Sequence, residues 1–429
     1  MTRGADTVAP VRTWSLAGLL LLAGLAAHPS AGARDGACGR ERDVGAGTLD
    51  EFTWRQLNAI YEEVGDERYG KAFDDLERML ERAGRDAYLR AILNQALGQV
   101  EWARENYESS LRHFERAVEL DTLPDQTHFA LMYQIAQLYF MENRFDEALA
   151  RLETWFCEAP PGNVTSAAYV LEASIHARRE DYAGAVEAID RAIAMDEDPQ
   201  EDWYLLRLAA HYELEQYPKA AMTLEVLIAR WPGKKLYWLQ LSQVYDRLKR
   251  DSQALAVLAL AYRRGLLDQQ ADIAYLSSLY SRAELPYKAA AVLEEGIRSG
   301  VVAGTGRHWT MVADEWYAAA ELERALAAYG EAGRASEDGE IDLRRAYILV
   351  DLERWPEALE ALDQALRKGR LDDRRTGEAY LLRGMTQFSL ENLDQAATDW
   401  ERAGRYESAR DAARQWLNHL REERQRRAS

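Results

Sequence analysis

The stretch QLYFMENRFDEALARLETW, which runs from Gln137 to Trp155, combines four large aromatic residues with the small residue Ala148. Counting from the first aromatic, offsets 0, +6, +9, +13 and +16 are occupied by Tyr139, Phe145, Ala148, Leu152 and Trp155. Four later stretches reproduce this spacing with different side chains. A repeated spacing with changing chemistry indicates helix packing rather than one reactive site.

The small residue recurs along the chain at intervals of 33 to 38 residues, as Ala72, Ser110, Ala148, Ala185, Ala220, Ala254, Ala289, Ala325, Ala358 and Ala396. Each unit carries two patterns of apolar residues at i, i+3, i+4 and i+7, which predict two amphipathic helices. A small side chain lets the second helix lie close against the first, where a bulky one would overpack the contact.

This period, with two helices per unit, resembles the tetratricopeptide repeat over Glu51 to Ala403. The resemblance implies an all-α fold, a right-handed superhelical solenoid of about ten helix-turn-helix repeats. Pro218, Pro286 and Pro356 fall where second helices begin, a place where proline is tolerated. We expect the solenoid to occupy residues 49–403, followed by a capping helix and basic tail at 404–429.

The N-terminus has the three parts of a secretory signal peptide. Arg3 and Arg12 precede an apolar run at residues 14–27, and Ala31 and Ala33 form a cleavage pattern. The alternative is a buried N-terminal helix. We expect a signal peptide at 1–33, a disordered leader at 34–48, and a mature chain with no membrane span, located in the periplasm.

The chain contains two cysteines, Cys38 and Cys157. They could pair in an oxidising compartment, and two unpaired thiols are the alternative. Asp35 stands where a lipoprotein signal carries an aliphatic residue, which argues against a lipid anchor on Cys38. The net charge of −19 argues against nonspecific binding to nucleic acid or anionic lipid.

No pattern of catalytic or metal-binding residues is present. The seven histidines lack zinc-site spacing, and there is no nucleophile elbow, phosphate loop or dinucleotide fingerprint. His176 and His211 occupy the same helix position as Tyr139, which predicts a packing role. We therefore expect no enzyme activity, no cofactor and no metal.

What remains is the face of each first helix that points away from the packing. In tetratricopeptide arrays this face lines a groove. The positions of residues within each repeat predict that the groove is lined by Gln95, Gln99, Tyr133, Gln137, Phe140, Tyr212, Gln243, Arg247, Ser278, Arg282, Asp314 and Tyr317. Amides and tyrosines suit an extended peptide backbone or a partner helix. The alternative for each residue is ordinary solvated surface.

A longer segment, Tyr237–Val302, together with Leu205–Ala220, resembles exported tetratricopeptide proteins that accompany TonB–ExbB–ExbD systems of Gram-negative bacteria. The pieces that carry it include YWLQLS, ALAYRRGLL and AELPYKAA. The resemblance implies a periplasmic scaffold that binds TonB-, ExbB- or ExbD-like inner-membrane components, or other envelope proteins, during outer-membrane uptake of ligands such as iron chelates. The alternative is a scaffold for polysaccharide export or outer-membrane complex assembly.

Overall fold

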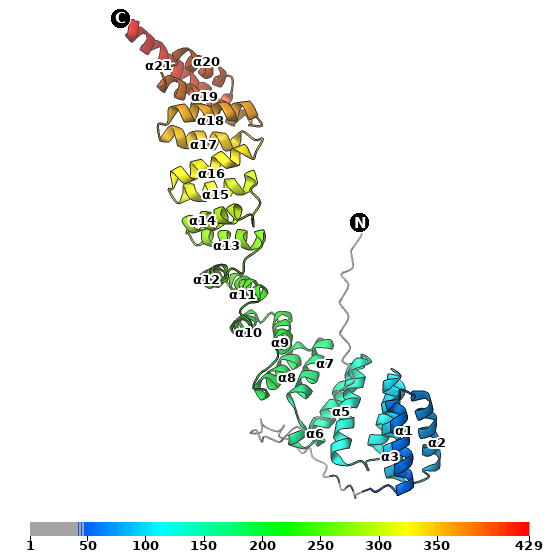
Figure 1. Ribbon diagram of the computed structural model, residues 1–429. Helices are drawn as coiled ribbons and strands as arrows, with labels where there is room; N and C mark the ends of the chain where they lie inside the picture. Colours follow the sequence, from blue (N-terminus) through cyan, green and yellow to red (C-terminus); the bar gives the residue numbers. More distant parts are fainter. Residues whose placement is uncertain (1–41, 43, 45–46, 429) are drawn as a thin grey trace. The chain divides into compact units, whose positions relative to one another are not determined.

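The computed structural model describes residues 42, 44 and 47–428. Within these residues the secondary structure consists of 21 α-helices and two short 3-10 helices. The predicted all-helical array with a C-terminal helix is confirmed (Figure 1). The predicted signal peptide lies outside the described residues. None of the helices in the described part of the chain has the length and apolar character needed to cross a membrane.

The chain divides into two compact units, the first ending at Pro199 and the second beginning at Gln200. The sequence contained no cue for this division. The first unit contains α1 (Glu51–Gly65), α2 (Tyr69–Arg82), α3 (Ala87–Ala103), α4 (Tyr107–Glu119), α5 (Asp125–Met141), α6 (Phe145–Glu158), η1 (Pro161–Asn163), α7 (Ser166–Arg178) and α8 (Tyr182–Met195).

The second unit continues the same alternation of helices. It contains α9 (Glu201–Glu213), α10 (Tyr217–Arg230), α11 (Lys235–Arg247), α12 (Asp251–Arg263), α13 (Gln270–Arg282), α14 (Pro286–Arg298), α15 (Gly306–Ala318), α16 (Leu322–Arg334), α17 (Glu340–Asp351), α18 (Trp355–Lys368), α19 (Asp373–Ser389), α20 (Leu393–Ala403), η2 (Glu407–Ala409) and α21 (Arg410–Ala428). In both units each odd-numbered helix up to α19 forms a hairpin with the helix that follows it.

Every hairpin turns in the same way. A residue at offset 0, here called the turn residue, accepts a 2.8–2.9 Å hydrogen bond from the N–H five residues later. The turn residues are Glu63, Glu101, Tyr139, His176, His211, Tyr245, Tyr280, Trp316, Leu349 and Gln387. The residue four positions after each has a positive φ of 53–63°, although none of them is glycine. This bond pattern, from the sixth residue back to the first, is the Schellman ending of a helix.

The predicted small residues lie at the closest contact inside each hairpin. All ten, from Ala72 to Ala396, are completely buried. In eight of the ten hairpins the residue three positions before the turn residue is also small, namely Gly98, Ala136, Ala173, Ser242, Ser277, Ala313, Ala346 and Gly384, and in the other two it is Ile60 and Leu208. Where one member is serine, its hydroxyl donates across the contact, as from Ser242 to the carbonyl of Ala254 at 2.9 Å. The two helices therefore approach almost backbone to backbone.

Neighbouring hairpins are joined by a second repeated contact. The turn residue Tyr139 donates its phenol proton to Glu115 in the second helix of the preceding hairpin. Tyr245 donates to Glu225 in the same way, and the indole of Trp316 donates to Glu294 at 3.1 Å. At these three junctions the bond restricts the rotation of a hairpin relative to the one before it.

Replacing Tyr245 with phenylalanine should lower the free energy of unfolding by about 0.5–1.5 kcal/mol, since one hydrogen bond is lost. Burial, together with the bond to Glu225, raises the pKa of Tyr245 to about 12. The protonated phenol is thus the favoured form in the folded state, and its contribution is complete below pH 10 and is lost as the pH rises toward 12. The difference between the native chain and the variant, measured by urea unfolding, should shrink between pH 8 and pH 11.5.

The matched control is Tyr317→Phe, because that side chain is 52 % exposed. We expect the control to leave the unfolding curve unchanged at both pH values. A difference for Tyr245→Phe that stayed constant with pH would contradict the role of the phenol proton.

The residue Arg42 lies within the expected disordered leader but has fixed contacts. Its guanidinium bonds to Asp121 and Asp125, at 2.7 Å each, and to the carbonyl of Leu123. The Arg42 side chain is only 3 % exposed. The Arg42 side chain therefore contacts the connection between α4 and α5 and the first residue of α5, while the disordered leader at 34–48 stays a prediction.

The C-terminal helix α21 covers the last hairpin as expected. Leu420 is buried against it, and the Trp416 ring stacks on Trp400 with 5.2 Å between ring centroids. Trp416 and Leu417 complete this apolar cluster. The array thus ends in a helix that is apolar on one side only.

Candidate functional site

The candidate site consists of the first-helix face, which we define as positions −9, −6, −2 and +1 relative to the turn residue in each odd-numbered helix. In the first unit it comprises Trp54, Leu57, Tyr61, Val64, Ile92, Gln95, Gln99, Trp102, Ala130, Tyr133, Gln137, Phe140, Ala167, Val170, Ser174 and Ala177. None of these sixteen residues is charged, although 29 % of the residues in the whole chain are charged. Five of the sixteen are exposed, namely Trp54, Tyr61, Gln99, Ala130 and Ala167, whereas Leu57 is buried in the core.

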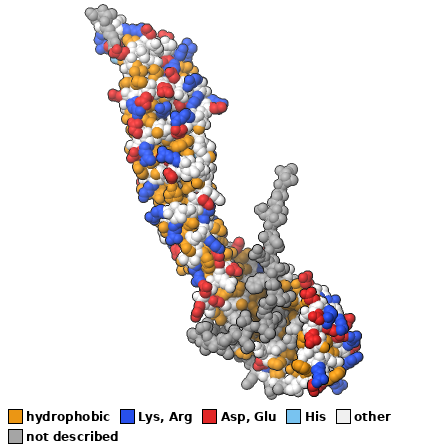
Figure 2. Space-filling view, in the orientation of Figure 1, with side chains coloured by type: hydrophobic (Ala, Val, Ile, Leu, Met, Phe, Trp, Pro, Cys, Tyr) orange, Lys and Arg blue, Asp and Glu red, His pale blue; other side chains and the backbone are white. Residues whose placement is uncertain are grey.

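The second unit differs at the same positions. There the first-helix face includes the charged residues Asp202, Asp246, Arg307, Asp314, Glu340 and Glu378. Figure 2 shows acidic and basic side chains interspersed over the visible surface of this unit, with no large area of one sign. The uncharged face is therefore a property of the first unit.

The residues predicted for the first unit differ in exposure. Gln99 is exposed, whereas Gln95, Gln137 and Phe140 are half-buried. Phe140 packs on Phe145 at the start of the second helix, with 5.8 Å between centroids. Of these four predicted residues, Gln99 is thus the most accessible.

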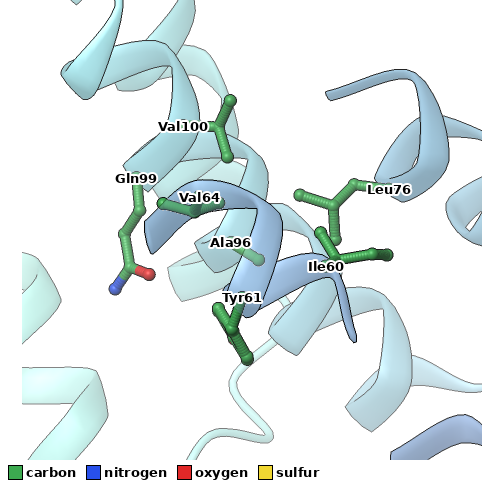
Figure 3. Close-up of a pocket in the computed structure, with 7 residues that line it drawn as sticks. All are labelled: Ile60, Tyr61, Val64, Leu76, Ala96, Gln99 and Val100. Carbon is green, nitrogen blue, oxygen red and sulfur yellow. The ribbon is translucent and has the colours of Figure 1, made fainter. Parts of the chain in front are cut away.

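Two aromatic residues at the same face were missed, Trp54 and Tyr61 on α1. They are 56 % and 44 % exposed. Tyr61 and Gln99 border a small cavity of about 20 Å³ (Figure 3), in which the Gln99 amide extends away from Leu76 and Ile60. Their register could have identified them, since Trp54 and Tyr61 lie nine and two residues before the turn residue Glu63.

The two predicted arginines are engaged in contacts between hairpins. The guanidinium of Arg247 lies 4.2 Å from the centroid of the Tyr217 ring. Arg282 forms a 2.6 Å bond to Asp246 in the hairpin before it. Arg178 in the first unit likewise lies over Phe145, at 5.5 Å. This position therefore joins successive hairpins, and a partner would have to compete for these groups.

The other residues predicted in the second unit have mixed surroundings. Gln243 and Ser278 are exposed, and Tyr317 is more than half exposed. Tyr212 packs edge-on against Tyr217 at 6.3 Å. Asp314 accepts a hydrogen bond from Tyr329.

Tyr133 is held by its neighbours rather than projecting freely. Its ring lies 5.3 Å from that of Trp155, and its phenol donates to the carbonyl of Ala167 at 3.3 Å. Burial raises the pKa of Tyr133. The change Tyr133→Ala would therefore disturb packing as well as any partner contact. The two effects could not be separated with this variant.

Tyr133 also borders a pocket of about 350 Å³. The residues that line this pocket, here called the α5 pocket, are Gln126, Phe129, Ala130, Tyr133, Trp155, Gly162, Asn163 and Thr165. They come from one face of α5, from α6, and from the connection to α7. The sequence contained no signal for it beyond the register position of Tyr133.

The histidines and cysteines take the following places. His211 is buried and His176 bonds to Asp181 at 2.8 Å, so both pack at the turn as predicted. Among residues 42, 44 and 47–428, no group of three or more His, Cys, Asp or Glu side chains is arranged to hold a metal ion.

Cys157 is half-buried near the end of α6, but Cys38 lies outside the described residues, and their pairing stays a prediction.

The family model for the tetratricopeptide repeat matches residues 96–164, 133–202, 170–222 and 343–412. No curated protein sequence matches the chain significantly.

Several solved structures are similar in part. One is a tetratricopeptide repeat protein from Parabacteroides merdae, 13 % identical, covering 59 % of this chain and 98 % of its own, with a TM-score of 0.29. The TPR2AB domain of yeast Sti1, solved in a complex with pHSP90, is 17 % identical. The match covers 59 % of this chain and 96 % of that domain, with a TM-score of 0.33. YrrB, described as having an unusual peptide-binding site, is 17 % identical. The match covers 46 % of this chain and 100 % of YrrB, with a TM-score of 0.34.

Proposed function

We propose that this chain is a periplasmic scaffold of a TonB-type energy-transduction system. The proposal starts from the tetratricopeptide-repeat matches at residues 96–164, 133–202, 170–222 and 343–412, because such repeats serve as protein-interaction scaffolds. In this role the mature protein binds TonB-, ExbB- or ExbD-like components through the first-helix face of its first unit. The bound components would serve outer-membrane uptake.

The observation that carries the proposal is the uncharged first-helix face. In a protein that is 29 % charged, the five exposed positions of this face, Trp54, Tyr61, Gln99, Ala130 and Ala167, carry no charge, and neither do the ten half-buried ones. Exposed Gln99, Trp54 and Tyr61 offer amide groups and aromatic edges, which suit a peptide backbone and apolar side chains. Solubility alone would not require this pattern.

Two features of the sequence support the location and the system. The signal-peptide pattern at residues 1–33 supports export, and the resemblance over Tyr237–Val302 supports the link to TonB-type proteins. The absence of a lipoprotein pattern before Cys38 supports a soluble periplasmic form.

The test uses the mature chain and the separately purified periplasmic domains of TonB-, ExbB- and ExbD-like proteins from the same organism. We expect biolayer interferometry to detect binding of at least one domain. The double variant Gln99→Glu, Gln137→Glu should weaken it at least tenfold, a cost of about 1.4 kcal/mol, because two charges then face an apolar partner.

The matched control is Thr154→Glu, which adds a charge on the exposed surface of the second helix α6. It should bind as the native chain does, and all variants should melt at similar temperatures. Lack of binding by every domain, or an equal loss in the control, would refute the proposal. Recovery of the protein in the membrane fraction with a lipid on Cys38 would favour the polysaccharide-export or outer-membrane assembly scaffold.

A further inference from the structure

The α5 pocket lies on the first-helix face, between α5 and the connection from α6 to α7. Gln126, Phe129, Ala130 and Tyr133 share one face of α5, spaced by three and four residues. Trp155 on α6 provides another wall. A volume of about 350 Å³ is near the lower end of the range for pockets that bind small ligands.

The aromatic walls of the α5 pocket are fixed before any ligand arrives. The indole N–H of Trp155 donates to the carbonyl of Phe129 at 2.8 Å. The Tyr133 ring lies at 40° to that indole, and its phenol is bonded to the carbonyl of Ala167. A preformed wall reduces the entropy lost on binding.

The charges around the α5 pocket select a neutral ligand. None of its eight lining residues is charged. One cation, Arg42, lies 5.7 Å from the Phe129 ring, and it is already paired with Asp121 and Asp125. A charged ligand group would lose its hydration here without gaining a partner.

We propose that the α5 pocket receives the aromatic side chain of an extended, uncharged segment of a partner protein. The half-buried Tyr133 ring allows edge-to-face and tilted contacts with the incoming ring, whereas Phe129 and Trp155, which are 3 % and 4 % exposed, contribute only small parts of the pocket wall. The side chains of Gln126, Asn163 and Thr165 can donate to and accept from the backbone of that segment. A sugar carries hydroxyl groups on most of its edges, and these three side chains would leave many of them without partners.

This inference rests on the proposed scaffold function and names the side chain that the scaffold selects. It also explains why Tyr133 is rigidly packed although it lies at a groove position. The ring forms the wall of the pocket rather than reaching into solvent.

The test compares two acetylated and amidated peptides, Gly-Gly-Trp-Gly-Gly and Gly-Gly-Ala-Gly-Gly, on the mature full chain. Saturation-transfer NMR should show contact with the tryptophan ring only. The variant Ala130→Phe fills the pocket from an exposed position on α5, and it should reduce the affinity at least tenfold.

The matched control is Ala271→Phe, since Ala271 is also exposed and also lies nine residues before a turn residue, but in the second unit. It should bind the tryptophan peptide as the native chain does. Equal affinity of the tryptophan peptide for Ala130→Phe and for the control would overturn the inference. Glucose is tested as a second probe, and saturation transfer to glucose but not to the tryptophan peptide would also overturn it. Binding that appeared only in Arg42→Ala would also overturn it, because the chain's own segment before Arg42 would then be the occupant.

The two proposals fail separately. Binding of the tryptophan peptide without binding of any TonB-, ExbB- or ExbD-like domain would leave the pocket standing and remove the named partners. Domain binding that is unaffected by Ala130→Phe, together with no peptide binding, would remove the pocket and leave the scaffold.

Discussion

Replacing Trp400 with alanine is expected to lower the free energy of unfolding of the C-terminal part of the array by about 3–5 kcal/mol. The Trp400 side chain is fully buried, and its indole N–H donates to the carbonyl of Leu381 at 3.3 Å. It stacks on Trp416 of α21, and the backbone of Gly384 lies against it. The truncation therefore leaves a cavity beneath the last helix.

The local character of this loss can be measured by hydrogen exchange. Each hairpin contacts mainly its neighbours, so the amides of α20 and α21 should lose protection while those of the first unit keep it. Trp54→Ala is the control, because Trp54 is 56 % exposed and makes the same change in size. Full protection of α21 in Trp400→Ala would show that Trp416 and Leu420 hold the helix without Trp400.

Replacing Ala254 with tryptophan should destabilise the α11–α12 hairpin by about 1–3 kcal/mol. Ala254 is completely buried, and its carbonyl accepts the Ser242 hydroxyl at 2.9 Å. A large side chain would push the two helices apart and break this bond. The same result is expected for Ala148→Trp in the first unit.

Urea unfolding followed by circular dichroism gives the measurement. Ala271→Trp is the control, since it places the same side chain at an exposed position in the next hairpin. The control should unfold as the native chain does. An Ala254→Trp variant with an unchanged transition would mean that the helices are not in contact at this residue.

Much of the fold could be predicted from residue spacing. The small residues from Ala72 to Ala396 located every hairpin, and all of them are buried as expected. The second set of small residues, from Gly98 to Gly384, was not recognised, although it precedes the first set by a constant twelve residues. The left-handed residues four positions after each turn residue could not be recognised at all, because glutamate occupies most of these positions and carries no signal for a positive φ.

The candidate site was less predictable. Register placed Gln99 and Gln243 at exposed positions of the first-helix face. The same register could not reveal that Arg247 lies over Tyr217 or that Arg282 bonds to Asp246. It also could not indicate the α5 pocket, whose walls come from three separate segments.

The sequence by itself determined the repeating unit: two helices, a small residue at their contact, and an aromatic residue near the turn. These follow from local periodicity, because the two helices of a hairpin lie within one repeat of 33 to 38 residues. Only the tertiary structure decided which face side chains are free and which are occupied by a neighbouring hairpin. Those contacts, such as Tyr133 with Ala167 and Arg247 with Tyr217, depend on the separation and rotation of successive hairpins. The separation and rotation of successive hairpins result from the packing of whole helices against each other, so no single residue spacing predicts them.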